Sequence, residues 1–308
     1  MRIRVLEPEG FPEAAIERLR TLGEVFLGKP SRTPEPGVEA VFVRLAERLD
    51  AAFHRTFPDL KWIVSPTTGL NHIDLEHFAA GGVEVVSLRG RAELLDRIHA
   101  TAEHTLALAL ALLRDIPGAT AAVREGRWDR YPHKGNELHG KRVLLLGYGR
   151  IGRMVAPLYR AFGCTVRAHD RLGGRVPDEL RCRFPEALAE TDLLSVHLPL
   201  EPQTRRLLGA GLLGLLPGHA VVVNTARGEV IDQEALLSAI EQGALAGAAL
   251  DVLWDEPDPV TPELRARLAA LGRRLVVTPH IGGFTDESLA AVEAYIADVF
   301  IAAVDGCD

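Results

Sequence analysis

The segment that most limits the fold of this chain is GYGRIG, residues 147–152, which follows the apolar run RVLLL and precedes a helical pattern. Gly147 permits a tight turn, Gly149 lets a pyrophosphate approach the backbone, and Gly152 lets the helix pack closely on the strand. The amides at the start of such a helix face the phosphates. Glycines in this position predict a dinucleotide-binding βαβ unit, and hence a parallel sheet.

An acidic residue, Asp170, ends the next apolar run. A carboxylate there is expected to accept hydrogen bonds from the adenosine ribose hydroxyls and to repel a 2′-phosphate, which favours NAD over NADP as the cofactor. The neighbouring Arg171 leaves NADP open. The simpler alternative is a helix that the glycines pack onto a strand, with Asp170 capping a turn.

Short β-branched runs alternate with helical patterns along the rest of the chain, as in parallel βαβ units. Two sets of strands are expected, the first at 2–6, 24–28, 39–44, 61–65 and 83–88, and the second at 141–147, 165–170, 193–198, 220–225, 246–252 and 273–280. A helix is expected over 98–116 between the sets, followed by a polar connection around Trp128. A last helix over 288–304 is expected to pack back on the first set.

Composition excludes several functions. The chain has 308 residues, is 47% hydrophobic and can therefore bury enough apolar surface for two domains. A formal charge of −7 with interleaved signs gives no basic surface for nucleic acid or for anionic lipid. The run LALALALL at 106–113 is too short to span a bilayer and predicts a buried helix.

The start of the chain and its cysteines indicate where the protein acts. MRIRVLEPEG contains no apolar core of signal-peptide length, so export is not expected. Cys164, Cys182 and Cys307 are odd in number and widely spaced, which argues against a disulfide framework and a thiolate metal site. No group of His, Asp or Glu has the spacing of metal ligands either. A cytoplasmic protein without a metal is expected.

Ionisable residues follow three of the predicted strands. Arg227 follows 220–225, Asp251 and Glu256 end or follow 246–252, and His280 ends 273–280. In an open parallel sheet, ligands bind at the carboxyl ends of the strands. A cation suited to a carboxylate, an acid and an imidazole are therefore expected at one edge. Individually, each residue has a common structural explanation, such as a capping arginine or a buried histidine.

Taken in order, GYGRIG, Asp170, SVHLPL, VNTARGEVID, AALDVLWDEP and TPHIGG resemble the D-isomer-specific 2-hydroxyacid dehydrogenase family. EGRW at 125–128 and LKWIVSPTTGLNHIDL at 60–75 extend the resemblance over nearly the whole chain, although GLNH at 69–72 and the segment before the long helix depart from the usual pattern. The resemblance implies an α/β protein with two doubly wound parallel-sheet domains. The smaller is a flavodoxin-like substrate domain, 1–97 completed by 281–308, and the larger is a Rossmann NAD-binding domain, 98–280.

The resemblance also implies roles for single residues. His280 is the acid/base, Glu256 the carboxylate that orients it, and Arg227 the arginine that binds substrate. The backbone around Thr68 and Gly69 holds the substrate carboxylate. Further residues contact NAD, at the pyrophosphate, along the cofactor and near the nicotinamide amide: Gly147, Gly149, Arg150, Ile151, Gly152, Asp170, His197, Thr225, Ala226 and Asp251.

The implied function is hydride transfer between NAD(H) and a small D-2-hydroxy or 2-oxo acid, with 3-phosphoglycerate, glycerate or hydroxypyruvate, and glyoxylate as leading substrates. Arg44 offers a contact for a phosphate, although a solvated arginine is the more frequent case. A homodimer is expected, because the apolar helix adjoins an exposed connection around Trp128. Two alternatives stay open: a non-catalytic NAD(H)-sensing protein of the same fold, and an NAD-dependent hydrolase acting on S-adenosylhomocysteine.

Overall fold

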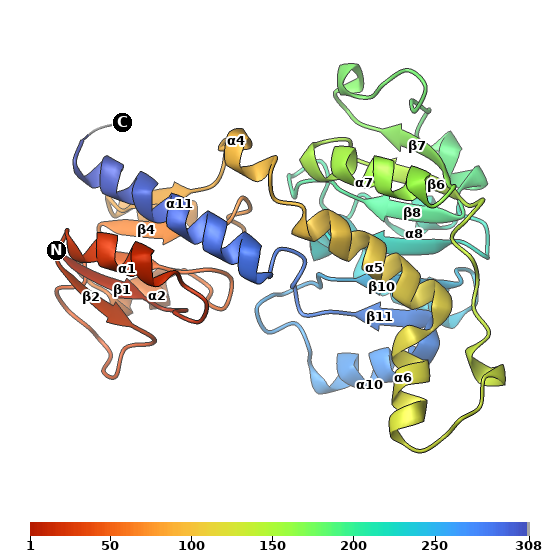
Figure 1. Cartoon of the computed structure of the whole chain (residues 1–308), viewed down its shortest axis with the longest axis horizontal. Coiled ribbons are helices and arrows are strands. Elements are labelled where there is room, and N and C mark those ends of the chain that lie inside the picture. The colour runs from red at the N-terminus through yellow and green to blue at the C-terminus, as the bar shows by residue number, and fades with distance from the viewer. Residues whose placement is uncertain (307–308) are drawn as a thin grey trace. The chain divides into compact units, whose positions relative to one another are not determined.

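The computed structural model describes residues 1–306 and divides into two compact units, whose chain course is shown in Figure 1. The terminal unit comprises Met1–Ile98 and the C-terminal segment that begins at Phe284, and the central unit comprises His99–Gly283. Cys307 lies outside the described residues. Each unit contains one parallel sheet with its own core.

The sheet of the terminal unit has five parallel strands in the order β2-β1-β3-β4-β5. These strands are β1 (Arg2–Val5), β2 (Glu24–Leu27), β3 (Ala40–Phe42), β4 (Trp62–Ser65) and β5 (Glu84–Ser87). Each strand lies within one of the sequence runs at which a strand was expected. The order 2-1-3-4-5 is the flavodoxin-like form of a doubly wound sheet, as expected.

Successive side chains of these strands point to opposite faces, and each face is covered by helices. Val5 and Phe42 pack with α1 and α11, while Val41 and Ile63 pack with residues of α2 and α3. The C-terminal helix therefore packs on the N-terminal sheet. The helices are α1 (Glu13–Arg20), α2 (Ala51–Thr56), α3 (Leu75–Ala80), α4 (Ala92–Leu95) and α11 (Asp286–Val304).

The sheet of the central unit has six parallel strands in the order β11-β10-β9-β8-β6-β7. These are β6 (Arg142–Leu146), β7 (Thr165–His169), β8 (Leu193–Val196), β9 (Val221–Asn224), β10 (Gly247–Leu250) and β11 (Leu275–Val277). An isolated parallel bridge between Ala168 and Arg181 adds a segment beyond β7. Counted with that segment, the order in chain numbering is 3-2-1-4-5-6-7, which extends the Rossmann arrangement by one strand and confirms the expectation.

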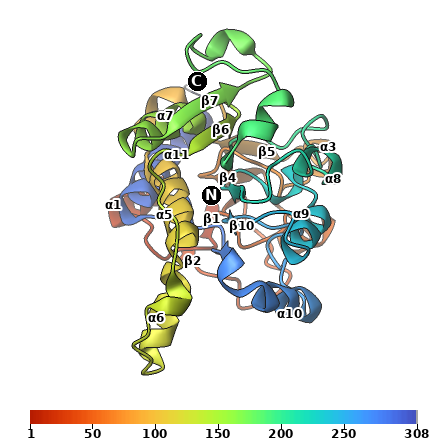
Figure 2. The same cartoon turned by 90° about the vertical axis from the view of Figure 1, so that its right-hand side faces the viewer.

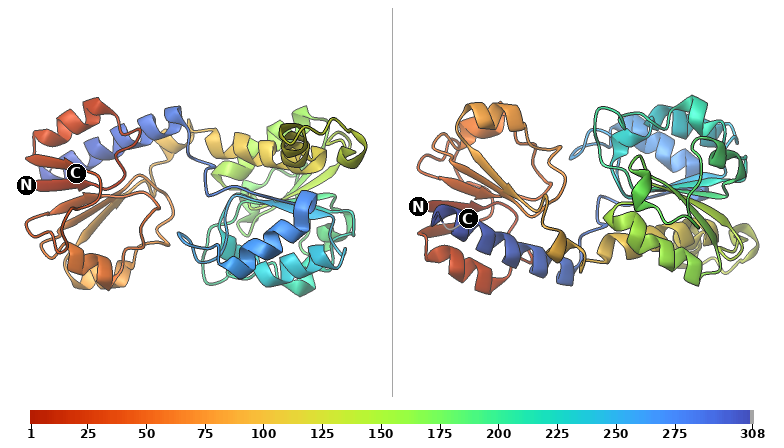
Figure 3. Two further views of the ribbon diagram at one scale, coloured as in Figure 1. Left: turned by 90° about the horizontal axis from the view of Figure 1, so that it is seen from below. Right: turned by 90° about the horizontal axis from the view of Figure 1, so that it is seen from above.

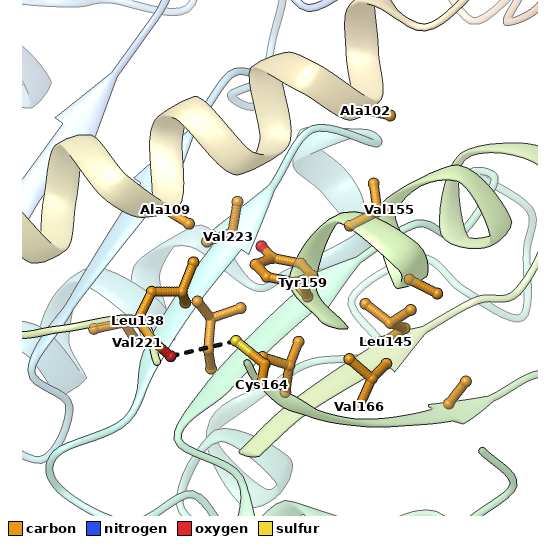
Figure 4. Packing of buried hydrophobic residues seen from close by; sticks show 14 of the residues in the cluster. Ala102, Ala109, Leu138, Leu145, Val155, Tyr159, Cys164, Val166, Val221 and Val223 are labelled. Atoms are coloured by element: carbon orange, nitrogen blue, oxygen red, sulfur yellow. Dashed lines mark hydrogen bonds between the residues drawn. The ribbon is translucent and has the colours of Figure 1, made fainter. Parts of the chain in front are cut away.

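Helices cover both faces of this sheet, as Figures 2 and 3 show. One face packs on α5 and α7, where Ala109, Tyr159 and Val223 share a core (Figure 4). The other face packs on α8, α9 and α10. The helices are α5 (Ala100–Arg114), α6 (Ile116–Arg124), α7 (Arg150–Ala161), α8 (Ala210–Leu213), α9 (Gln233–Glu241) and α10 (Pro262–Leu271).

The helix expected over 98–116 differs in the structure. It ends at Arg114, because Asp115 adopts a left-handed conformation with φ 50°, and a second helix, α6, follows at once. Pro117 favours this restart, since proline suits the first turn of a helix. None of the described helices can cross a membrane by itself, although α5 and α6, bent by 64°, together have the necessary length and composition.

Candidate functional site

The glycine-rich turn joins β6 to α7 in the central unit. Gly147 has φ +100°, and a Cβ on it would lie 2.5 Å from the carbonyl oxygen of His197. A Cβ on Gly152 would collide with the carbonyl oxygen of Gly147. A Cβ on Gly149, by contrast, would meet no atom within 4 Å. Two glycines are thus required by the packing of the chain, while the third leaves space above the turn.

The first turn of α7 faces this space. Gly149 is the N-cap residue, and Arg150 and Ile151 are the first residues of a helix that runs to Ala161. Its first amides have no acceptors within the helix, and the helix dipole places positive potential there. Both features suit an anionic group such as a pyrophosphate.

Asp170 follows β7 and holds the glycine-rich turn. One carboxylate oxygen accepts a hydrogen bond from the amide of Tyr148 at 2.8 Å, and the other accepts from the amide of Leu172 at 2.8 Å. Each oxygen keeps a second lone pair for another donor. The neighbouring Arg171 lies 3.5 Å from the carboxylate of Glu201 in an exposed ion pair.

His197 follows β8, the strand beside β6. Its Nε2 lies 2.9 Å from the Ser195 hydroxyl, whereas Nδ1 is buried and has no hydrogen-bond partner among residues 1–306. Burial lowers the pKa of His197 to about 3, so the ring is neutral. A buried nitrogen without a partner beside the glycine-rich turn, together with the open space above Gly149, fits a bound dinucleotide.

The turn after β9 is shaped by Asn224. Its side-chain oxygen accepts from the Ala226 amide at 3.0 Å, and its amide nitrogen donates to the Arg227 carbonyl at 2.9 Å. The Thr225 hydroxyl lies 2.8 Å from the hydroxyl of Thr105 on α5. This turn holds Thr225, Ala226 and Arg227 in place.

Arg227 is a partly buried cation just beyond the carboxyl end of β9. Its Nη1 donates to the Ala226 carbonyl at 2.6 Å, which holds the side chain against the turn. Burial lowers the pKa of Arg227, and the charges of Glu256 and Glu229 oppose this effect. A guanidinium remains charged at neutral pH in any case.

Glu256 and His280 lie together, although sequence spacing alone could not show it. Nδ1 of His280 is 2.5 Å from Oε2 of Glu256, and Oε1 of Glu256 accepts from the Leu253 amide at 3.0 Å. Both side chains remain partly exposed, that of His280 at 22% and that of Glu256 at 29%. The carboxylate therefore orients the imidazole and leaves its Nε2 available for proton exchange.

Asp251 lies at the end of β10, and its side chain is 1% exposed. It accepts hydrogen bonds from the hydroxyl of Thr278, the ring of His104 and the amides of Ile281 and Gly282. Burial raises its pKa, but the hydrogen bonds outweigh burial and leave the pKa below its ordinary value. The Asp251 carboxylate thus holds in place the segment that follows β11.

Thr68 and Gly69 belong to the terminal unit, in the loop after β4. The hydroxyl of Thr67 donates to the Gly69 carbonyl at 2.9 Å and lies 2.9 Å from the Ser65 hydroxyl. These contacts hold the loop, and Thr68 is exposed at its tip.

Arg44, also in the terminal unit, is not the solvated arginine that is usual at such a position. It is 8% exposed, and its Nε lies 2.5 Å from Oε1 of Glu293 on α11. Its Nη2 donates to the Glu9 carbonyl at 2.8 Å. The guanidinium is therefore committed to the protein, and the idea that it meets a substrate phosphate loses its support.

Sequence reasoning missed several residues of the central site. Asn224 could have been found from its place directly before the predicted arginine turn. His104 and Thr278 gave no comparable signal, because a histidine on an apolar helix and a threonine in a strand are common. Their approach to Asp251 depends on tertiary packing.

Comparison with known proteins places these features in a family. Residues 106–282 match the family model described as "D-isomer specific 2-hydroxyacid dehydrogenase, NAD binding domain". The D-3-phosphoglycerate dehydrogenase of Mycobacterium tuberculosis is 37% identical over 258 residues, which are 82% of this chain and 47% of that protein. The hydroxypyruvate reductase of Thermotoga maritima is 34% identical over 256 residues, which are 82% of this chain and 80% of that protein.

A solved structure gives the same picture. The TT0316 protein from Thermus thermophilus is 33% identical, with a TM-score of 0.82 over 99% of this chain and 97% of that one. The chain spans about half the length of the phosphoglycerate dehydrogenases that it matches. Because the family model covers most of the unit that holds the site, and the relatives align along most of the sequence, this chain belongs to the D-isomer-specific 2-hydroxyacid dehydrogenase family.

Proposed function

We propose that the protein is an NAD-dependent oxidoreductase that interconverts a small D-2-hydroxy acid and the corresponding 2-oxo acid. The observation that carries this proposal is the His280–Glu256 pair, with its 2.5 Å contact, and the partly buried cation Arg227, whose pKa is lowered by burial and raised by the charge of the same carboxylate. An acid/base and an anion-binding group at the ends of neighbouring strands favour catalysis over a purely sensing role.

In the oxidation direction, Nε2 of His280 takes the proton of the C2 hydroxyl, while the hydrogen on C2 leaves with its electron pair and the C2–O bond becomes a carbonyl. NAD, when bound, would supply the acceptor for that hydride, and NADH would supply the hydride for reduction. Glu256 stabilises the imidazolium that results. In reduction, the protonated His280 returns its proton to the C2 oxygen.

Arg227 binds the substrate and polarises the reacting oxygen. Its planar fork can donate two hydrogen bonds to a carboxylate or to the C2 oxygen. The contact with the Ala226 carbonyl restricts its side chain before substrate arrives. We further assign the amides around Thr68 and Gly69 to the substrate carboxylate.

The residues that would hold NAD are those around the glycine-rich turn: Gly147, Gly149, Arg150, Ile151 and Gly152. We place Asp170 at the adenosine ribose and His197, Thr225 and Ala226 along the cofactor. The unused lone pairs of Asp170 and the ion pair that draws Arg171 toward Glu201 favour NAD over NADP.

Within this class we propose that the substrates are unphosphorylated acids, and that hydroxypyruvate and glyoxylate are the leading candidates. Arg44, the candidate contact for a phosphate, is already bonded to Glu293 and to the Glu9 carbonyl. Phosphohydroxypyruvate remains the competing substrate, because relatives aligned with most of this chain are named D-3-phosphoglycerate dehydrogenase.

We also propose a homodimer. The apolar run of α5 packs within the central unit, with Leu108 and Leu112 buried there, so it does not itself call for a partner. The following arm does, because Trp128 is 92% and Tyr131 84% exposed. Arg273 donates to the carbonyls of Pro132 and Lys134 and so holds the arm in place.

We also propose that the protein acts in the cytoplasm, because the free thiols of Cys164 and Cys182 suit a reducing compartment.

The test is NADH oxidation with hydroxypyruvate, glyoxylate, pyruvate, phenylpyruvate and 3-phosphohydroxypyruvate, repeated with NADPH. We expect turnover, greatest with an unphosphorylated acid and with NADH. Binding of NADH without turnover of any acid would refute catalysis and favour a sensing protein. A higher kcat/KM with NADPH would refute the assignment of Asp170.

A further inference from the structure

A hydrogen-bonded group of side chains lies behind the segment that carries His280. Nε2 of His104, on α5, is 3.2 Å from Oδ1 of Asp251 and 3.0 Å from the hydroxyl of Thr278. The Thr278 hydroxyl donates to the same Asp251 oxygen at 2.6 Å. All of these residues belong to the central unit.

The chemistry of the group determines which atom donates. The hydroxyl of Thr278 has one proton, and the carboxylate of Asp251 can only accept, so that proton lies toward Asp251. Nε2 of His104 must then carry a hydrogen to make both of its contacts. His104 is thus a donor to Asp251, both as the neutral Nε2–H tautomer and as the imidazolium.

Asp251 in turn holds the backbone on both sides of His280. Its carbonyl accepts from the His280 amide at 2.8 Å, and its carboxylate accepts from the amides of Ile281 at 2.9 Å and Gly282 at 2.7 Å. His280 has φ 54°, a left-handed conformation that costs energy in a residue with a Cβ. Such a conformation persists only where its surroundings hold it.

We propose that His104 is a positioning residue, which fixes the Asp251 carboxylate and thereby keeps the His280 segment in its left-handed conformation. α5 is a rigid support for this role, because Leu108 and Ala109 are buried in the core of the central unit. The role in catalysis rests on the function proposed above, whereas the effect on the backbone does not.

Hydrogen exchange of the peptide spanning 278–283 tests the effect on the backbone without substrate or cofactor. In His104→Leu, which removes the donor but fills the space, we expect the amides of Ile281 and Gly282 to exchange about fivefold to tenfold faster. His104→Gln retains an N–H donor and should restore slow exchange. His99→Gln, the same change at an exposed position on the approach to α5, should have no effect.

Kinetics with the best acid of the substrate panel test the effect on catalysis. We expect kcat to fall about tenfold in His104→Leu, because a small misplacement of a reacting group already costs rate. KM and the pH at which reduction declines should stay near their wild-type values, since Arg227 and the Glu256–His280 pair are intact. His104→Gln should recover most of the loss.

The two measurements test different claims, so a negative result in one can be told from a negative result in the other. Unchanged exchange in His104→Leu, or equal impairment of the Leu and Gln variants, would overturn the positioning role. A wild-type protein that turns over none of the acids would refute the proposed function, while exchange would still decide the role of His104. If His104→Leu does not fold, His104→Asn, whose amide is shorter, replaces it in both measurements.

Discussion

Three side chains of the central unit form the proposed catalytic group, and each is held in place by a different contact. Arg227 is held by its own turn, Glu256 by the amide of Leu253, and His280 by Glu256. Because the carboxylate contacts Nδ1, Nε2 is the nitrogen of His280 to which we assign the proton transfer of the proposed reaction. A substitution that changes only the charge or only the shape of one of these side chains therefore tests its role.

Glu256→Gln keeps the shape of the side chain and removes its charge. The carboxylate accepts a hydrogen bond from Nδ1 of His280 and so keeps the ring in one orientation, with Nε2 toward the reacting oxygen. The rates of reduction and of oxidation should therefore both fall, by about tenfold or more. Rate profiles in both directions check this, with Glu256→Asp as the variant that retains the charge. Profiles that coincide with the wild type would contradict the pairing.

Arg227→Lys keeps the charge but removes the planar fork. An ammonium cannot reproduce paired hydrogen bonds to a carboxylate, so kcat/KM should fall by about 10²-fold, in the range that the loss of one preorganised donor costs. Affinity for NADH should change little. Steady-state kinetics and NADH fluorescence titration measure the two effects. Near-normal kcat/KM would remove Arg227 from the site.

At the scale of elements, the turn between β6 and α7 bears on cofactor binding, and the ion pair between the segment after β3 and helix α11 bears on the stability of the terminal unit. The turn has glycines of two kinds, those required by the chain's own packing and one that faces open space. Arg44, which follows β3, forms a buried ion pair with Glu293 on α11, beside the contact between the rings of Phe42 and Phe300.

Gly149→Ala and Gly152→Ala should therefore differ. A methyl group on Gly149 enters the space above the turn, so NADH affinity should fall about tenfold while the melting temperature stays unchanged. A methyl group on Gly152 collides with the Gly147 carbonyl, so that variant should lose stability by about 1–3 kcal/mol. Titration and thermal unfolding of both variants check this. Equal loss of stability would refute the distinction.

Arg44→Leu should destabilise the terminal unit in a pH-dependent way. Burial raises the pKa of Glu293 to about 7 even though Arg44 lowers it, so without Arg44 the carboxyl group takes up a proton more readily and becomes neutral at low pH. Stability that depends on its protonated form is present below its ordinary pKa of 4.5 and is lost as the pH rises toward 7. We expect a loss of about 3–5 kcal/mol at high pH, typical of an unpaired buried charge, and a smaller loss at low pH.

Urea unfolding well above and well below neutral pH measures this effect. Arg48→Leu is the matched control, because Arg48 is an exposed arginine on the same segment and its loss should cost at most about 0.5 kcal/mol. A loss for Arg44→Leu that is equal at both pH values would show that Glu293 does not titrate in this range.

At the scale of the whole molecule, α6 and the arm that follows it present large apolar side chains that the central unit does not cover. Ile116 and Val123 on α6 are about half exposed, at 50% and 52%, and Trp128 and Tyr131 are almost fully exposed. Exposed apolar side chains gathered in one segment mark an interaction surface. A second copy of the chain is the partner that we propose.

Light scattering should therefore give the mass of a dimer at micromolar concentration. Trp128→Glu places a charge on this surface and should weaken the dimer, because a buried unpaired charge is costly at an interface. Phe162→Glu changes an exposed aromatic residue at the end of α7 and serves as the control. A monomeric wild type, or equal effects of the two substitutions, would refute the proposed surface.

Much of the fold and part of the candidate site could be predicted from residue order alone. Short β-branched runs alternating with helical patterns placed the strands, and the glycines of 147–152 marked the candidate cofactor-binding turn. Arg227, Glu256 and His280 follow β9, β10 and β11, which are neighbours in the sheet. Their shared edge was predictable, because carboxyl ends of parallel strands lie on the same side.

Only the tertiary structure decided which side chains meet. The contacts of His104 with Asp251 and of Arg44 with Glu293 join residues 147 and 249 positions apart. No local pattern encodes such contacts, because they depend on how helices α5 and α11 seat on their sheets. For the same reason the sequence determined that ionisable residues gather at the edge of a Rossmann sheet, while packing determined which nitrogen of His280 contacts Glu256 and why Arg44 is bonded to Glu293.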